Sequence, residues 1–557
     1  MIKKLLLGAL ALLPAPLLAF SALESYIRPN PNPSVPNAAV LFVHSSQPVD
    51  LTVTLSSDRH QRRFEFTGHD GGKTPLPLVG FYPGRQHQIL VEVTEQGNHE
   101  SSFTLNHHYT APRLPSDPAQ FPDILIKRNA SVITEPGITL FNPRRRLPVA
   151  NAAQGDSKAN DFNRNFGLLV AVDDRGEVIW HYQSDSRISD YQITAQGTVI
   201  YMTQDYRLVE IDPLGNVLRQ WYAAHRPQGP LEGGIPVDTL TFHHSFNQLD
   251  NGNLLLLGSE RRQVENYYTS ETDTEAPRKT QWVMGDEALE ITPEGEIVWR
   301  WRAFDHLDPF DIGYETFIGY WTRRGFPDTW CWSHANKILP LADGNALINF
   351  RHLSAVAKLD RSHENVAPLW LAGPDQPQSA FPQLAMQQGQ WYWHQHSPSI
   401  TPDGHLMVFD NANYQAHAFQ TPTAPADTRS RIVQYRLDED NGLLTQHWDS
   451  EIPGDPGVVS YAMGSAQTLT NTGNILAGYG FILADDDVAN NDWQSFEQDN
   501  AWTRIREYSP STPAQVAWEL TLQAKSNSHD LGWSLFGARR IPDFLGIWPG
   551  SQATAAE

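Results

Sequence analysis

A unit of two short apolar strands joined by a turn recurs along most of this chain, and it limits the possible fold more than any other feature. Its clearest copies read LVEIDPLGNVLRQW (208–221) and ALEITPEGEIVWRW (288–301). Looser copies occupy residues 170–182, 355–370, 432–448 and 503–520. Because one such unit cannot bury its apolar face alone, this repetition indicates an architecture in which each unit packs against its neighbours.

A second hairpin precedes five of these six copies. Its turns are Gln196-Gly197, Asn251-Gly252, Asp343-Gly344, Asp403-Gly404 and Thr472-Gly473. Two hairpins make four antiparallel strands, which is the content of one propeller blade. The first copy has only residues 137–141 before it, while a spare strand remains at 533–541. We therefore predict an all-β chain with a six-bladed β-propeller that the C-terminal strand closes, which removes exposed sheet edges.

The rest of the chain divides into flanking segments. Residues 1–21 combine two lysines, an apolar run and small residues, which predicts a cleaved secretory signal peptide and a periplasmic protein. Residues 22–112 carry short apolar runs between Gly and Pro turns and predict a small β-sandwich. Residues 113–130 are Pro-rich and indicate a linker. The propeller is then expected over 131–545, followed by a tail at 546–557.

Charge and cysteine content restrict the partners and the chemistry. The formal net charge of −22 disfavours nucleic acid and anionic membranes as partners, and an anionic ligand would need a local cluster of cations. Once the signal is removed, no membrane-spanning stretch is expected. Cys331 is the single cysteine, so no disulfide forms within the chain. Its aromatic surroundings predict a buried, inert thiol.

Histidines stand at the start of the first strand in three of the repeated units. They are His244 (HHSFNQLDNG), His334 (HANKILPLADG) and His396 (HSPSITPDG). If the first strand of each unit is innermost, its starts meet at one mouth of the central channel. Arg351 ends the following antiparallel strand and is expected at the same mouth. The neighbouring histidines are expected on the opposite face, because side chains alternate along a strand; these are His243, His352 and His394.

Two kinds of ligand suit such a group of side chains, a metal cation and an anion. Three neutral imidazoles suit a zinc ion. Arg351 would repel a cation and instead suits an oxyanion held bidentately, so we favour an anion site. A propeller that binds a ligand without catalysis remains an alternative, because a fold alone does not set function.

Three longer segments connect the chain to a known family. FHHSFNQLDNGNLLLL, WSHANKILPLADGNALINFRHLSAVAKLD and QHSPSITPDGHLMVFDNAN resemble the signature segments of the bacterial arylsulfate sulfotransferases, and the resemblance covers nearly the whole mature chain. It implies an exported enzyme with an N-terminal β-sandwich and a six-bladed propeller, and it suggests a homodimer. The activity it implies moves a sulfuryl group from an aryl sulfate donor to a phenolic acceptor, without a nucleotide sulfate donor or a cofactor. The family's disulfide near the site cannot form here.

The resemblance also implies a role for each predicted residue. His396 would be the nucleophile and form a sulfohistidine, which predicts ping-pong kinetics. His244 and His334 would donate hydrogen bonds to the sulfuryl oxygens, and one of them could protonate the leaving phenolate. Arg351 would stabilise charge in the transition state.

Two asparagines in the same segments are weaker candidates. Asn336 (HAN) and Asn411 (FDN) would bind substrate or orient the imidazoles. A metal-dependent hydrolase or sulfatase built on the three histidines remains the competing enzyme class.

Overall fold

The computed structural model describes residues 23–58, 60–96, 98–148, 157–374, 381–483, 492–493, 500–523 and 531–543, and these are almost entirely strands and loops. The predicted signal peptide and C-terminal tail lie outside these residues. The helical segments within them are α1 (Ser157–Arg164), η1 (Ala303–Asp305), η2 (Thr322–Arg324) and η3 (Pro425–Asp427). Across the described ranges, no helix has the length and apolar character needed to span a membrane.

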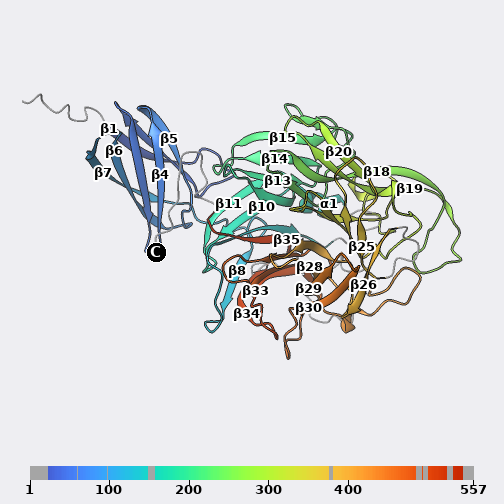
Figure 1. Cartoon of the computed structure of the whole chain (residues 1–557). Coiled ribbons are helices and arrows are strands. Elements are labelled where there is room, and N and C mark those ends of the chain that lie inside the picture. The colour runs from blue at the N-terminus through green and yellow to red at the C-terminus, as the bar shows by residue number, and fades with distance from the viewer. Residues whose placement is uncertain are drawn as a thin grey trace, which may run out of the picture.

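Two sheets form the N-terminal part, which lies to one side of the other sheets (Figure 1). The first is β1 (Leu23–Pro29), β2 (Ala39–Ser45) and β5 (Gly72–Leu78). The second, in order, is β4 (Gln61–His69), β3 (Val49–Ser56), β6 (Gln86–Glu95) and β7 (Asn98–Thr110). Sequence patterning missed β1 and β5. In β5 the cause is Pro75 and Pro77, which suit its position at a sheet edge and otherwise indicate a turn.

The remaining sheets repeat a run of four antiparallel strands, so the fold is all-β and propeller-like. The first three runs are β35 (Gly532–Ile541), β9 (Ile138–Arg146), β10 (Gly167–Val172) and β11 (Val178–Ser184); β12 (Ile188–Ile193), β13 (Val199–Thr203), β14 (Arg207–Ile211) and β15 (Val217–Ala223); and β17 (Phe246–Gln248), β18 (Leu254–Tyr267), β19 (Lys279–Ile291) and β20 (Ile297–Arg302). The next three are β22 (Ala335–Pro340), β23 (Ala346–Phe350), β24 (Ala355–Leu359) and β25 (Trp370–Ala372); β27 (His396–Ile400), β28 (His405–Asp410), β29 (Arg431–Asp438) and β30 (Leu443–Asp449); and β31 (Ser465–Thr468), β32 (Ile475–Leu483), β33 (Ala501–Tyr508) and β34 (Val516–Gln523).

Four further strands pair with strands of these runs. They are β8 (Asp123–Arg128) on β34, β16 (Ile235–Val237) on β15, β21 (Thr329–Cys331) on β19, and β26 (Gln383–Gln388) between β25 and β30. Because β26 pairs with both β25 and β30, two runs join into one nine-stranded sheet.

The turn glycines predicted from the sequence are confirmed. Each of the five connects the first two strands of a run and has a positive φ, between 70° and 87°: Gly197, Gly252, Gly344, Gly404 and Gly473. A side chain would be strained in that conformation, which explains why the turn uses glycine.

The C-terminal strand joins the first run, as predicted. β35 pairs antiparallel with β9 from Gly532↔Arg146 to Ile541↔Ile138, and in Figure 1 the red strand lies beside the cyan and green ones. Leu535 of β35 is fully buried in an apolar cluster with Phe141 of β9 and Leu476 of β32. Residues from opposite ends of the chain therefore share one core.

The predicted linker, 113–130, was partly wrong. Residues 123–128 form β8, which pairs with β34 from Asp123↔Gln523 to Arg128↔Trp518. Ile124 and Ile126 pack against the apolar cluster below this sheet, so the alternating apolar residues of DILIKR decide the structure there rather than the preceding prolines.

Replacement of Leu535 by alanine tests the importance of this closure. We expect Leu535→Ala to lower the free energy of unfolding by about 2–5 kcal/mol, because it leaves a cavity in a fully buried cluster. Ile133, which is 79% exposed, gives a matched control: Ile133→Ala should change stability by less than about 0.5 kcal/mol. Equal unfolding midpoints in urea for the two variants would contradict the closure.

Candidate active site

The four residues predicted as catalytic line one cavity of about 150 Å³. They are His244, His334, His396 and Arg351. A second cavity of about 210 Å³ adjoins it and shares His244, His396 and Phe536 with it. Asn336 lines only the second cavity. The strand starts of three different runs therefore meet at one place, as the repeat pattern required.

Asn411 fixes the orientation of His396. Its amide nitrogen donates to the backbone oxygens of Ser460 (2.8 Å) and Met463 (2.9 Å), so its side-chain oxygen faces His396 as an acceptor. That oxygen lies 2.7 Å from Nδ1 of His396. Nδ1 must therefore carry the proton, and Nε2 keeps its lone pair. Asn336 does not contact the His396 ring. Its amide donates to the backbone oxygen of Gln395 (3.0 Å), the residue before His396.

His244 belongs to a chain of hydrogen bonds that begins at the backbone oxygen of Gly258, beside the buried carboxylate of Asp286. Nε2 of His243 lies 2.8 Å from the backbone oxygen of Gly258 and 3.3 Å from Asp286, so it donates. Nδ1 of His243 then accepts from Nδ1 of His244 at 2.9 Å. This assignment leaves the lone pair of His244 on Nε2, 3.3 Å from the hydroxyl of Tyr320.

His334 lies between His244 and the single cysteine. Its ring centroid is 4.8 Å from that of His244, and its Nδ1 is 3.0 Å from Sγ of Cys331. Burial raises the pKa of the Cys331 thiol well above its usual value, so the buried, unreactive thiol expected from the sequence fits its environment. His352 stacks on the other face of His334 at 4.5 Å.

Burial keeps the three site imidazoles neutral. It lowers the pKa of His396 to about 3, with the charge of Arg351 as the next cause. Burial also lowers the pKa of His244 and of His334 well below the usual value, helped by neighbouring histidines. A neutral imidazole with a lone pair on Nε2 is the nucleophilic form.

Arg351 is already paired, which differs from its predicted role as a free anion clamp. Nη1 and Nη2 donate to the two oxygens of Glu315 at 2.5 and 3.0 Å, and Nη2 also lies 3.4 Å from the backbone oxygen of Tyr461. A buried guanidinium needs a counter-charge, and Glu315 in the 303–330 insertion supplies it. Two of the five N–H donors of Arg351 take no part in these contacts.

The three histidines do not occupy equivalent positions in their runs, contrary to the prediction. His396 opens the strand pairing of β27 with Phe409, whereas His334 comes one residue and His244 two residues before the corresponding first pairs. His394 is the true counterpart of His244, yet it lines neither cavity. The backbone at His244, His334 and His394 has a positive φ, so simple alternation fails there, and His243 also lines the first cavity.

Besides Arg146 at the end of β9, three further arginines that the sequence reading missed line the same cavity. They are Arg144 of β9, Arg187 just before β12, and Arg324 of η2. Two of them had a signal: Arg144 lies in the last three residues of β9, the second strand of its run, and Arg187 precedes a first strand as His334 does. Arg324 lies in an insertion, where the repeat gives no information.

The zinc arrangement left open by the sequence requires the ligand atoms of His244, His334 and His396 to converge. Within the described ranges, two groups of metal-ligand side chains converge to within 4.8 Å, and neither is this one; they are Cys331, His334 and His352, and His60, Asp173 and Asp174. A protonated thiol is a poor ligand, and burial favours the protonated form of Cys331.

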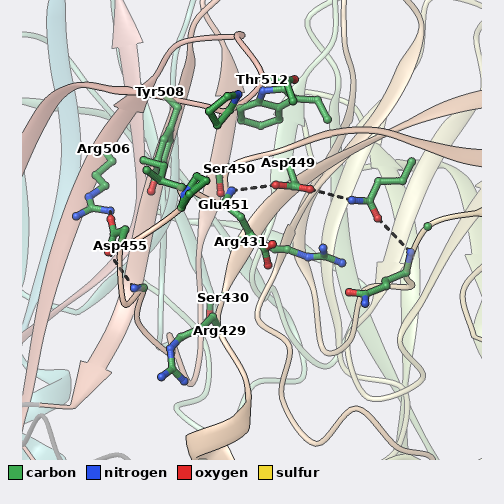
Figure 2. Close-up of a pocket in the computed structure, with 18 of the residues that line it drawn as sticks. Arg429, Ser430, Arg431, Asp449, Ser450, Glu451, Asp455, Arg506, Tyr508 and Thr512 are labelled. Carbon is green, nitrogen blue, oxygen red and sulfur yellow. Dashed lines mark hydrogen bonds and ion pairs between the residues drawn. The ribbon is translucent and has the colours of Figure 1, made fainter.

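A larger cavity, of about 750 Å³, lies elsewhere (Figure 2). Two of its arginines are paired with acids: Arg506 donates to Asp455 at 2.7 Å, and Arg431 donates to Asp410 at 3.1 Å. None of the histidines predicted as catalytic lines it. Size alone therefore does not identify the site.

A comparison with known protein families gives a match over most of the chain. The model of the arylsulfotransferase (ASST) family matches residues 126–531, which is most of the chain and contains every predicted site residue. The chain belongs to the arylsulfotransferase family. Membership supports an arylsulfotransferase activity, with an aryl sulfate as donor and a phenol as acceptor.

Other comparisons add little to this. No curated protein matches the sequence of this arylsulfotransferase. A Bacteroides caccae protein of unknown function is 11% identical, with a TM-score of 0.37, over 72% of this chain and 98% of that one. A catalytically inactive virginiamycin B lyase from Staphylococcus aureus, solved with quinupristin, is 10% identical, with a TM-score of 0.29, over 72% and 99%. The Dos1 propeller is 8% identical, with a TM-score of 0.26, over 79% and 86%.

Replacing Asn411 tests the orientation of His396 in this arylsulfotransferase. We expect Asn411→Ala to lower sulfuryl transfer by about 10²-fold or more, because Nδ1 loses the acceptor that fixes the imidazole tautomer. Asn413 is a matched control, since it is also buried and donates to the same neighbouring segment, at the backbone oxygen of Tyr461. Transfer rates should separate the two variants even where their melting temperatures agree, and similar rates would contradict this role of Asn411.

The buried histidines predict acid sensitivity. Burial lowers the pKa of His181 to about 4 and those of His352 and His396 to about 3. Below pH 6.5 these histidines are protonated in the unfolded chain but stay neutral in the folded protein. Their contribution to the free energy of unfolding is therefore fully present above pH 6.5 and is lost as the pH falls. At pH 5 each such histidine lowers the free energy of unfolding by about 2 kcal/mol. The melting temperature should therefore drop between pH 7 and 5, and less steeply in His181→Gln; a flat profile would contradict this.

Proposed function

We propose that this protein transfers a sulfuryl group from an aryl sulfate to a phenol through a covalent intermediate on His396, without a nucleotide sulfate donor. The observation that carries the proposal is the hydrogen bond from Nδ1 of His396 to Asn411. It leaves the Nε2 lone pair of a neutral imidazole at the cavity where His244, His334 and Arg351 also lie.

In the first half-reaction, Nε2 of His396 attacks sulfur and an N–S bond forms. The S–O bond to the aryl group breaks, and the phenolate leaves with its electron pair and takes a proton from water. His334 assists: when the Cys331 thiol donates to its Nδ1, its Nε2 carries a proton for a sulfuryl oxygen. Arg351, held in place by Glu315, offers its remaining N–H groups to the same charge.

In the second half-reaction, the oxygen of a phenol acceptor attacks sulfur. The N–S bond breaks, and its electron pair returns to Nε2 of His396. The acceptor gives its proton to Nε2 of His244, whose lone pair is set by the chain from Gly258, beside Asp286, through His243. This role as a base departs from the hydrogen-bond donor expected for His244 from the sequence.

We propose a six-bladed propeller as the scaffold, with the two N-terminal sheets as a sandwich. The six runs of four strands and the pairing of β35 with β9 support this count. Export to the periplasm is also part of the proposal, and it rests on the signal-like sequence of residues 1–21.

His396→Asn tests the nucleophile. With 4-methylumbelliferyl sulfate as donor and phenol as acceptor, we expect transfer to fall by about 10³-fold or more, because the covalent intermediate on His396 can no longer form. The matched control is His394→Asn, which replaces a buried histidine two positions away that lines neither cavity.

Three outcomes of this experiment bear on the proposal. Incubation with donor alone should add one SO₃ group to His396, seen by peptide mass spectrometry, and phenol should remove it. Full activity of His396→Asn would overturn the nucleophile. Donor cleavage at the same rate without phenol would instead identify a sulfatase.

A further inference from the structure

The cavity around the proposed nucleophile holds more positive charge than one sulfuryl group requires. Arg144, Arg146, Arg187 and Arg324 line it together with Arg351, and its one carboxylate, Glu315, is paired with Arg351. Within the described part of the chain, the guanidiniums of Arg144, Arg187 and Arg324 form no ion pair. Each donates to a neutral oxygen instead: Arg144 to Ile188 (2.9 Å), Arg187 to the side chain of Gln204, and Arg324 to Tyr320 (2.9 Å).

Two of these arginines are one aromatic ring away from His244. The guanidinium of Arg144 stacks on Phe536 at 4.5 Å, and that ring lies 6.3 Å from the ring of His244. The guanidinium of Arg324 stacks on Tyr320 at 3.5 Å, and the Tyr320 hydroxyl lies 3.3 Å from Nε2 of His244. The unpaired cations and the aromatic rings thus form one wall next to the reacting group.

These arginines repel one another, and no carboxylate among the described residues of the cavity neutralises them. Burial, followed by the charge of Arg324, lowers the pKa of Arg144 to about 9, and burial together with the charges of Arg144 and Arg324 lowers that of Arg187 well below its usual value. In the larger cavity, by contrast, Arg506 contacts Asp455 and Glu519, and Arg431 contacts Asp410. The chain as a whole is acidic, with a net charge of −22. Among the described residues, the lack of carboxylate partners for Arg144, Arg187 and Arg324 is therefore specific to this cavity.

We propose that the aromatic substrates of this enzyme carry a second anionic group, such as a carboxylate, on the aryl part, and that Arg144, Arg187 and Arg324 bind it. This inference rests on the proposed function, in which the sulfuryl group binds at His396, His244 and His334. The aryl group then lies against the adjacent wall of Phe536 and Tyr320. In a ping-pong reaction, donor and acceptor occupy the aryl subsite in turn, so the preference applies to both.

The test compares two acceptors that differ only in this charge, 4-hydroxyphenylacetate and 4-hydroxyphenylacetamide, with 4-methylumbelliferyl sulfate as donor. We expect kcat/KM to favour the carboxylate by about 10-fold or more, since a charge-assisted hydrogen bond in a protected site is worth that much. Arg187→Gln and Arg144→Gln should remove the preference by slowing the carboxylate and leaving the amide almost unchanged. Arg261→Gln is the matched control, because Arg261 also stacks on a ring, Trp282 (4.3 Å), and donates to a carbonyl oxygen, that of Pro327, outside the cavity.

Two results would overturn the inference. One is equal kcat/KM for the two acceptors in the unaltered enzyme. The other is an equal loss with both acceptors in the arginine variants, which would mean that the arginines bind the sulfuryl group itself.

Binding measurements keep the test independent of catalysis. By calorimetry, 4-hydroxyphenylacetate should bind the unaltered protein at least about 10-fold more tightly than the amide, and Arg187→Gln should abolish the difference. If neither acceptor is sulfated while this binding preference is present, the proposed function has failed and the anionic subsite stands. If transfer proceeds with both acceptors and no preference exists in binding or rate, the subsite has failed and the proposed function stands.

Discussion

The pairing of β35 with β9 is the contact on which the site depends. It joins segments from opposite ends of the chain, and each strand contributes a side chain to the cavity: Phe536 from β35 and Arg144 from β9. The ladder shifts register between Leu535 and Ala538, at the position of Phe536. Closure of the fold and assembly of the aryl wall are therefore the same event, and a chain that lost the last strand would lose part of the site with it.

Burial gives the site its chemistry through opposite effects on two kinds of residue. For the imidazoles, low exposure disfavours the charged form and so preserves the lone pair that attacks sulfur. Arginine remains charged in proteins, so burial instead leaves a positive potential that an anion relieves. Neutral nucleophiles and permanent cations can share one small cavity because their ordinary pKa values differ so widely. The charge of Arg351 further lowers the pKa of His396, so the two groups reinforce each other.

The repeat pattern was enough to predict the sheets, the turn glycines and the side chains that reach the mouth of the channel. Each of those depends on local sequence: a glycine with positive φ, a strand start, or a strand end. The same rule, applied to the end of β9 and the start of β12, would have pointed to Arg146 and Arg187, and so to the neighbourhood of Arg144. It could not find Glu315, Tyr320 or Asp286, because the first two lie on an insertion and Asp286 reaches the site only through hydrogen bonds. Strand alternation failed at His244, His334 and His394, where a left-handed backbone residue interrupts it.

Arg351 differs from Arg144 and Arg324 in having an acidic partner, and this difference suits it to another task in the site. Glu315 holds Arg351 with two hydrogen bonds, which fixes the guanidinium but cancels most of its charge at a distance. A fixed donor suits a group that must meet sulfuryl oxygens at one geometry in every turnover. Arg144 and Arg324 are held instead by carbonyl oxygens and aromatic faces, which position a guanidinium without neutralising it. Such cations keep their full attraction for an anion that arrives with the substrate and leaves with the product.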